Sequence, residues 1–190
     1  EDEEAMRRAW LKRLHANALE RDFTLNSLMY DVESRELYDF VGGIDDVRQR
    51  VVRTVISPSR SFRDDPARMI RAVRVTARHN FRAGRDIMAS MRALAHTVRS
   101  VPPARVSGEI HTVLSCGYAA RAVRMMWECG LLEHVMPLHA AYIAKAVNPA
   151  SNYPGGGGGD GGGGGAFYTT FKEPPQEDDY VLGRDDEDVD

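Results

Sequence analysis

The stretch RDDPARMIRAVRVTAR, residues 63–78, carries the clearest structural pattern in the chain. Pro66 suits the first position of a helix, and Asp65 suits the N-cap before it, where a carboxylate accepts a backbone N–H of the first turn. Apolar side chains follow at helical spacing on one face: Met69, Ile70, Val73, Ala77 and Phe81. The stretch therefore predicts an amphipathic helix over residues 66–79.

The opposite face of this predicted helix is rich in arginine. At 100° per residue, Arg71, Arg74 and Arg78 fall within about 60° of one another, and Arg68 lies on the flank. No glutamate follows at i+4 to neutralise any of them. Such a face suits phosphate groups, whereas a plain solvated helix surface is the alternative interpretation.

Asp65 and Arg68 predict a specific recognition chemistry. Three residues apart at a helix start, they place a hydrogen-bond acceptor beside planar donors. Cytosine and adenine present an amino group next to a ring nitrogen, which matches this pair. Uracil and guanine present a carbonyl instead, and each buried polar group left unpaired costs about 1 to 3 kcal/mol. The pair is therefore expected to select C and A without a template.

The segments on either side indicate a change from mixed to helical structure. Downstream, apolar periodicity predicts helices over residues 85–98, 103–114, 118–129 and 138–146. Upstream, the pattern predicts a helix over residues 6–19, a short helix within 23–30 and a further helix over 44–50. It also predicts a turn over 31–35 and strands over 36–41 and 51–56. Two strands alone do not make a stable sheet, so we expect this sheet to be incomplete.

Residues 20–28, ERDFTLNSL, alternate polar and apolar side chains. The polar members are Arg21, Asp22, Thr24 and Asn26, and the alternation places them on one side, as contacts with a ribose and phosphates require. The start of a capped helix has a similar pattern and is the alternative interpretation.

Charge divides the chain into two parts of opposite sign. Residues 1–148 hold 23 basic and 18 acidic side chains, whereas residues 149–190 hold 2 basic and 10 acidic ones. Because residues 155–165 are almost entirely glycine and little apolar follows, residues 149–190 are predicted to be a disordered tail. The four residues at the start are expected to be a solvated edge.

The remaining composition excludes several classes of protein. No stretch approaches the roughly 18 to 20 apolar residues of a membrane span, and the acidic start is unlike a secretory signal. Cys116 and Cys129 have no metal-ligand spacing, so both are predicted to be reduced, buried thiols.

Three consecutive stretches resemble motifs of one enzyme family. They are ERDFTLNSLMYD at 20–31, YDFVGGIDDVRQRVVRTV at 38–55 and SFRDDPARMIRAVRVTARHNF at 61–81. In order and spacing they are similar to the class II RNA nucleotidyltransferases, the tRNA CCA-adding enzymes and bacterial-type poly(A) polymerases. RVSGEIHTVLS at 105–115 and RMMWECGLLEHVMP at 124–137 resemble the helical regions that follow in this family.

The resemblance implies a set of nucleotide-binding residues: Arg21 and Asp22 at the ribose and phosphates, Asp65 and Arg68 at the base, and Arg71 and Arg74 as further contacts. It also implies that residues 42–46 are a hinge-like link and that Arg105 and Glu109 belong to a structural helical motif. Glu20 and Asp64 depart from the arginine and glutamate of the family pattern, so contacts from these two positions are in doubt.

The implied fold is α+β followed by all-α. Residues 1–62 correspond to the end of a nucleotidyltransferase head, 63–148 to a helical neck and the start of an RNA-binding body, and 149–190 to the tail. ATP and CTP are the implied substrates and an RNA 3′ end is the implied partner, and no membrane association is expected. CCA addition and polyadenylation share these motifs, and both stay open.

The family uses two divalent ions, normally Mg²⁺, held by an Asp-x-Asp pair on a strand that lies upstream of the first motif seen here. The Asp-x-Asp spacings of this chain fall within residues 186–190 and are assigned no metal role. We therefore expect a portion of a longer enzyme, which binds nucleotide and has no catalytic residues of its own. The alternatives are a non-catalytic RNA-binding or scaffold fragment and a plain helical interaction domain.

The sequence says less about the cellular location of the protein than about its chemistry. High arginine usage and the glycine run are typical of GC-rich coding sequences, and residues 130–146 look most like plant or algal members of the family. An intracellular location in a chloroplast, mitochondrion or nucleus is the resulting expectation, and the oligomeric state stays open.

Overall fold

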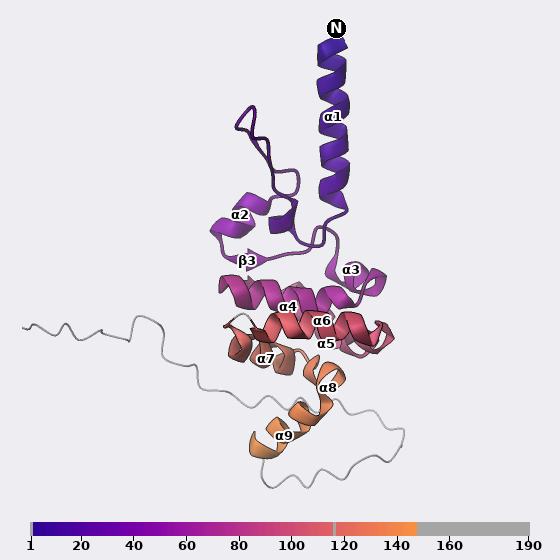
Figure 1. Ribbon diagram of the computed structural model, residues 1–190, viewed down its shortest axis with the longest axis vertical. Coiled ribbons are helices and arrows are strands. Elements are labelled where there is room, and N and C mark those ends of the chain that lie inside the picture. Colours follow the sequence, from indigo (N-terminus) through magenta and orange to yellow (C-terminus); the bar gives the residue numbers. More distant parts are fainter. Residues whose placement is uncertain (1, 116, 148–190) are drawn as a thin grey trace, which may run out of the picture. The chain divides into compact units, whose positions relative to one another are not determined.

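The computed structural model describes residues 2–115 and 117–147. The chain divides into two units, and all described residues lie in the first, Glu1–Tyr153. The predicted fold class is confirmed: a short α/β segment with small sheets precedes a mostly helical part (Figure 1). The predicted disordered tail lies outside the described residues.

The N-terminal segment begins with a helix that is longer than predicted. Its elements are α1 (Asp2–Leu19), the 3₁₀ helix η1 (Thr24–Ser27), β1 (Met29–Tyr30), β2 (Leu37–Tyr38), α2 (Gly43–Arg48), β3 (Val51–Val52) and α3 (Pro58–Asp64). Helix α1 starts at Asp2 because acidic residues favour a helix N-terminus. Glu4 also pairs with Arg8 at 3.1 Å, one turn later. The first acidic residues are thus part of a helix, although Asp2 and Glu4 are exposed as expected.

The strands pair in a way that the sequence pattern did not predict. β1 and β2 form an antiparallel pair, closed by a turn in which Arg35 has a φ of 58°. β3 instead pairs in parallel with β4 (Arg82–Ala83), which follows the long helix α4 (Ala67–His79). The two predicted strands are therefore shorter than expected and do not pair with each other. Their partners were missed because a two-residue strand has too little alternation to detect, and β4 is distant in sequence.

Backbone hydrogen bonds fix the segment that carries Asp22. The Thr24 N–H donates to the Arg53 carbonyl at 3.0 Å, and the Val55 N–H donates to the Asp22 carbonyl at 3.2 Å. Phe23, between them, is fully buried. Residues 22–24 are thereby held against residues 53–55, the stretch that follows β3.

The helical part confirms the predicted series with small changes in bounds. It comprises α4 (Ala67–His79), α5 (Arg85–Leu94), the 3₁₀ helix η2 (Ala95–Ser100), α6 (Pro103–Ser115), α7 (Ala119–Glu128), α8 (Leu132–Val135) and α9 (Pro137–Val147). Helices α3 and α8 were not predicted, although Pro58 after Ser57 is a typical helix start. Figure 1 shows α4 between β3 on one side and α6 and α7 on the other.

The core is built around α4. Met69, Ile70 and Val73 are fully buried, as the apolar pattern predicted. Cys129 is buried, as predicted, and burial raises the pKa of its thiol to about 11. Cys116 lies outside the described residues.

Within the described part of the chain, no helix combines the length and apolar character that a membrane crossing requires.

Candidate functional site

A polar cavity of about 460 Å³ lies where the N-terminal segment meets α4. It is lined by Glu20, Arg21, Asp22, Asn26, Asp65, Arg68 and Arg71. Five of the six predicted nucleotide-binding residues thus share one cavity, although they come from two segments about forty residues apart. Arg74, the sixth, is not part of the lining.

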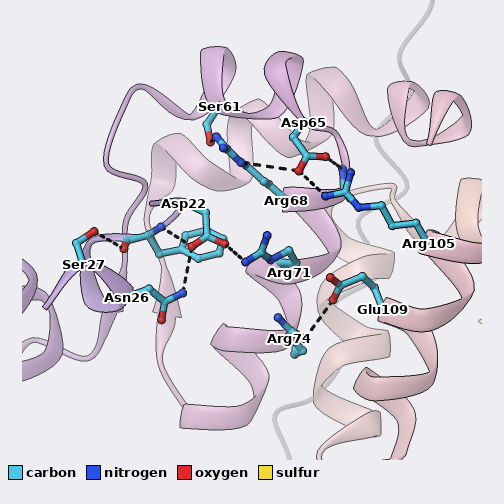
Figure 2. Close-up of polar contacts among 12 residues, drawn as sticks. Asp22, Asn26, Ser27, Ser61, Asp65, Arg68, Arg71, Arg74, Arg105 and Glu109 are labelled. Carbon is cyan, nitrogen blue, oxygen red and sulfur yellow. Dashed lines mark hydrogen bonds and ion pairs between the residues drawn. The ribbon is translucent and has the colours of Figure 1, made fainter. Parts of the chain in front are cut away.

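Asp22 is the most strongly held side chain of this cavity. It is 7% exposed, and its Oδ1 accepts the Phe23 N–H at 2.9 Å and the Asn26 Nδ2–H at 3.1 Å. Its Oδ2 lies 2.9 Å from Arg71 Nη2 in an ion pair (Figure 2). Three contacts from neighbouring groups thus fix the orientation of the buried Asp22 carboxylate.

The alternation in residues 20–28 is confirmed only in part. Arg21, Asp22 and Asn26 line the cavity, but Thr24 is buried and donates its hydroxyl to Asp46 Oδ2 at 2.6 Å. The 3₁₀ turn of η1 explains the difference, because a strict alternation of sides requires an extended chain. Arg21 itself donates to Asn17 Oδ1 at 3.0 and 3.2 Å, so the end of α1 orients this exposed guanidinium.

Asp65 lies at the sharp turn between α3 and α4. The proline that follows favours an extended conformation at Asp65, whose φ and ψ are −148° and 97°. Its Oδ1 accepts the Ala67 N–H at 3.1 Å, which is the predicted capping interaction. Helix α4 begins at Ala67, one residue later than predicted. The carboxylate is therefore fixed at the N-terminus of α4.

Arg68 and Asp65 lie beside each other, as their spacing predicted. Arg68 Nε is 4.0 Å from Asp65 Oδ2, and both side chains are only 21% exposed. Arg68 Nη1 also donates to Ser61 Oγ at 3.0 Å. The Asp65 carboxylate, an acceptor, and the Arg68 guanidinium, a planar donor, thus both line the cavity at the start of α4.

A second arginine holds Asp65 from helix α6. Arg105 Nη2 donates to Asp65 Oδ2 at 2.6 Å, and this hydrogen bond raises the pKa of the Arg105 guanidinium above its ordinary value (Figure 2). The sequence indicated a structural motif at Arg105 and Glu109 but not this contact. The two residues are forty positions apart, and no local signal connects them.

The arginine face of α4 is not the unneutralised surface that the sequence predicted. Arg68 and Arg71 pair with Asp65 and Asp22, and Arg74 Nη1 lies 3.3 Å from Glu109 Oε2. The prediction was wrong because it considered only partners at i+4 on the same helix. The carboxylates of Asp22 and Glu109 come from other elements, so the arginines here join segments as well as facing the cavity.

The described residues do not provide a metal centre. Across residues 2–115 and 117–147, no group of three or more His, Cys, Asp and Glu side chains could hold a metal ion. Of the three cavity carboxylates, Asp22 and Asp65 are already engaged with arginines and Glu20 is exposed. The donor set therefore does not fit Mg²⁺, and no metal-dependent step is assigned to it.

Family models match both parts of the chain. The Poly A polymerase head domain matches residues 1–53, and the region described as "Probable RNA and SrmB- binding site of polymerase A" matches residues 80–143. Together these matches cover more than half of the sequence.

Curated relatives and solved structures agree with these models. Poly(A) polymerase I of Escherichia coli O6:H1 is 33% identical over 132 residues, which cover 70% of this chain and 28% of that protein. The multifunctional CCA protein of Xanthomonas campestris pv. campestris strain B100 is 35% identical over 135 residues, covering 68% and 32%. The Bacillus stearothermophilus CCA-adding enzyme in complex with CTP is 32% identical with a TM-score of 0.60, covering 62% and 30%.

This chain spans about 30% of the length of the relatives that it matches. The similarity to the head domain lies at residues 1–53 and the similarity to the RNA-binding region follows at residues 80–143. The chain therefore belongs, as a partial chain, to the class II RNA nucleotidyltransferase family of poly(A) polymerases and CCA-adding enzymes.

Proposed function

We propose that this chain supplies the base- and ribose-binding part of an RNA nucleotidyltransferase that adds C and A, or A alone, to RNA 3′ ends without a template. The observation that carries the proposal is the single cavity shared by Asp65, Arg68, Asp22 and Arg71. ATP and CTP are the proposed substrates. The similar enzyme from Bacillus stearothermophilus was solved in complex with CTP, which supports this choice.

Asp65 retains acceptor capacity for a base. Each carboxylate oxygen has two lone pairs. Oδ1 receives the Ala67 N–H and Oδ2 receives Arg105, so each oxygen keeps capacity for one further donor. The amino group of cytosine or adenine would donate to Asp65 while Arg68 donates to the ring nitrogen. A uracil or guanine carbonyl would face the carboxylate instead, and that contact is repulsive.

Asp22 and Arg71 are proposed to bind the sugar and phosphates, together with Arg21. Arg71 Nε is buried and has no hydrogen-bond partner among the described residues, and the buried Asp22 Oδ2 has only its ion pair with Arg71 Nη2. Buried polar atoms are normally satisfied, so these two atoms suit a ligand hydroxyl and a ligand phosphate. Arg74 is proposed as a further contact, which requires its guanidinium to extend past Glu109.

The proposal assigns the chemical step to residues beyond those that the structure describes. Divalent ions such as Mg²⁺ would supply the charge stabilisation that nucleotidyl transfer requires. The described donor set does not fit these ions. We therefore propose that this chain binds a nucleotide and does not transfer it unaided.

RNA is the proposed macromolecular partner. The RNA-binding model that matches residues 80–143 supports it. So does the charge of residues 1–148, where 23 basic side chains exceed 18 acidic ones. Basic residues bind the RNA backbone without reading its sequence, which suits an enzyme that adds to many 3′ ends.

Equilibrium titration of the whole chain with ATP, CTP, UTP and GTP tests the proposal. ATP and CTP are expected to bind about tenfold or more tightly than UTP and GTP, since one unpaired buried group costs about 1 to 3 kcal/mol. Arg68→Ala should weaken ATP and CTP binding. Arg63→Ala removes an exposed arginine nearby and should change neither affinity. Equal affinities for all four nucleotides would contradict the proposal.

A non-catalytic RNA-binding or scaffold role is the second candidate. The match of residues 80–143 to an RNA-binding region fits this role without any catalytic step. It predicts RNA binding in a gel-shift experiment without selectivity among the four nucleotides. A plain helical interaction domain, the third possibility, predicts binding of neither RNA nor nucleotide.

A further inference from the structure

Ser61 contacts both members of the base-reading pair. It lies on α3 and is fully buried. Its hydroxyl oxygen accepts Arg68 Nη1 at 3.0 Å, and its backbone carbonyl accepts the Asp65 N–H at 3.1 Å (Figure 2). One residue outside the cavity lining thus connects the acceptor and the donor that face it.

From these contacts we infer that Ser61 is a positioning residue that sets the nucleotide selectivity of Asp65 and Arg68. The inference rests on the proposed function of that pair. Ser61 would touch no nucleotide, because it is fully buried and does not line the cavity. Its effect is exerted through the direction in which the Arg68 guanidinium points.

The physical reason is that Arg68 needs an external anchor. A guanidinium has five donors on a long, flexible side chain, and the Asp65 carboxylate is 4.0 Å from Arg68 Nε, too far for a hydrogen bond. The Ser61 hydroxyl supplies the short contact. Ser61 is itself held in α3, where its N–H donates to the Ser57 carbonyl at 3.0 Å.

Without this anchor, Arg68 keeps its charge but loses a fixed orientation. A freely turning guanidinium can donate to the carbonyls of uracil or guanine as well as to the ring nitrogens of cytosine or adenine. Ser61→Ala should therefore lower selectivity more than it lowers total affinity. We expect the ratio of ATP to GTP affinity to fall about tenfold, in line with the loss of one hydrogen bond to a charged group.

The test is an equilibrium titration of the full chain and its variants with ATP and GTP. Ser61→Ala removes the hydroxyl, and Ser61→Cys keeps the volume while replacing the hydroxyl by a weakly bonding thiol. Both should lower the ATP to GTP ratio. Ser57→Ala, at an exposed hydroxyl on the same helix start, should leave the ratio unchanged. Thermal unfolding of each variant identifies any general loss of structure, which would lower both affinities together and leave their ratio unchanged.

The outcomes separate this inference from the proposed function. If the unaltered chain prefers ATP and both Ser61 variants keep that preference, the positioning role is overturned while the proposed function stands. If the unaltered chain itself shows no preference, the proposed function fails and this inference fails with it. A lowered ratio in both variants, with Ser57→Ala unchanged, supports the positioning role.

Discussion

Asp65 receives contacts from three residues, two in the first turn of α4 and one on α6. The Ala67 N–H fixes one oxygen, Arg105 fixes the other, and Arg68 lies beside it. Arg105 is 48% exposed, and ion pairs at such positions contribute only about 0 to 1 kcal/mol to stability. The contacts at Asp65 therefore matter more for the direction of the carboxylate than for the stability of the fold.

Replacement of Asp65 by alanine tests its role as the acceptor. Asp65→Ala should relax the rejection of UTP and GTP, so that the preference for ATP and CTP falls about tenfold. It should also cost about 1 kcal/mol in stability because the cap of α4 is lost. Competition binding at a temperature well below unfolding measures the first effect. Asp64→Ala is the control. Asp64 is exposed, and its ion pair with Arg60 is long, at 3.9 Å. An unchanged preference in Asp65→Ala would remove this residue from base recognition.

At the scale of elements, α2 packs closely on η1 through Gly43. A Cβ at Gly43 would lie 2.4 Å from the Thr24 carbonyl oxygen, which is backbone and cannot turn away. Gly43→Ala should therefore push α2 off the segment that carries Asp22, at a cost of about 1 to 3 kcal/mol.

Urea unfolding of matched glycine variants measures this effect. Gly108 lies in α6, and an added Cβ there would meet no heavy atom within 4 Å. Gly108→Ala should increase the free energy of unfolding by about 0.5 to 1 kcal/mol, because glycine is unfavourable within a helix. Equal effects of the two substitutions would show that the close approach at Gly43 is absent in solution.

The loop before α2 depends on the charge of Asp39. Its carboxylate accepts four backbone N–H groups, those of residues 41–44, at 2.9 to 3.1 Å. Burial alone would raise the pKa of Asp39, but these hydrogen bonds outweigh it and hold the pKa below its ordinary value. A lowered pKa in the folded state means that the ionised form stabilises the fold. This contribution is complete above about pH 4 and is lost as the pH falls through the folded-state pKa.

Asp39→Asn should consequently flatten the dependence of stability on pH below about pH 4. At neutral pH it should cost about 1 kcal/mol, since an amide accepts these hydrogen bonds less strongly. Denaturant unfolding at a series of pH values is the measurement. Asp45→Asn, an exposed residue in the same region, should keep the original pH profile. If Asp39→Asn also keeps it, the carboxylate does not support this loop in solution.

Sequence reasoning succeeded where structure is local. Helix α4, its cap at Asp65 and the closeness of Arg68 follow from spacing within one helix, and each is present. It failed where contacts cross the chain. The β3–β4 pair, the Arg105 contact and the Ser61 anchor are set by tertiary packing, which periodicity in one segment does not encode.

At the scale of the whole molecule, charge is the property that predicts RNA affinity. Residues 1–148 carry 23 basic and 18 acidic side chains, and binding to an oligonucleotide should release counterions. For about four phosphate contacts to single-stranded RNA, affinity should fall about 10- to 100-fold between 50 and 200 mM salt. Fluorescence anisotropy with a labelled adenosine oligomer measures this slope. An affinity that does not change with salt would exclude backbone binding by this basic surface.

The central claim is that Asp65 and Arg68 take the place of a complementary base. A crystal structure of the chain soaked with CTP tests it most directly. We predict that the cytosine amino group lies within hydrogen-bond distance of the Asp65 carboxylate and that Arg68 donates to the ring nitrogen. CTP bound with its cytosine away from this pair, while the phosphates contact Arg21 or Arg71, would contradict the claim.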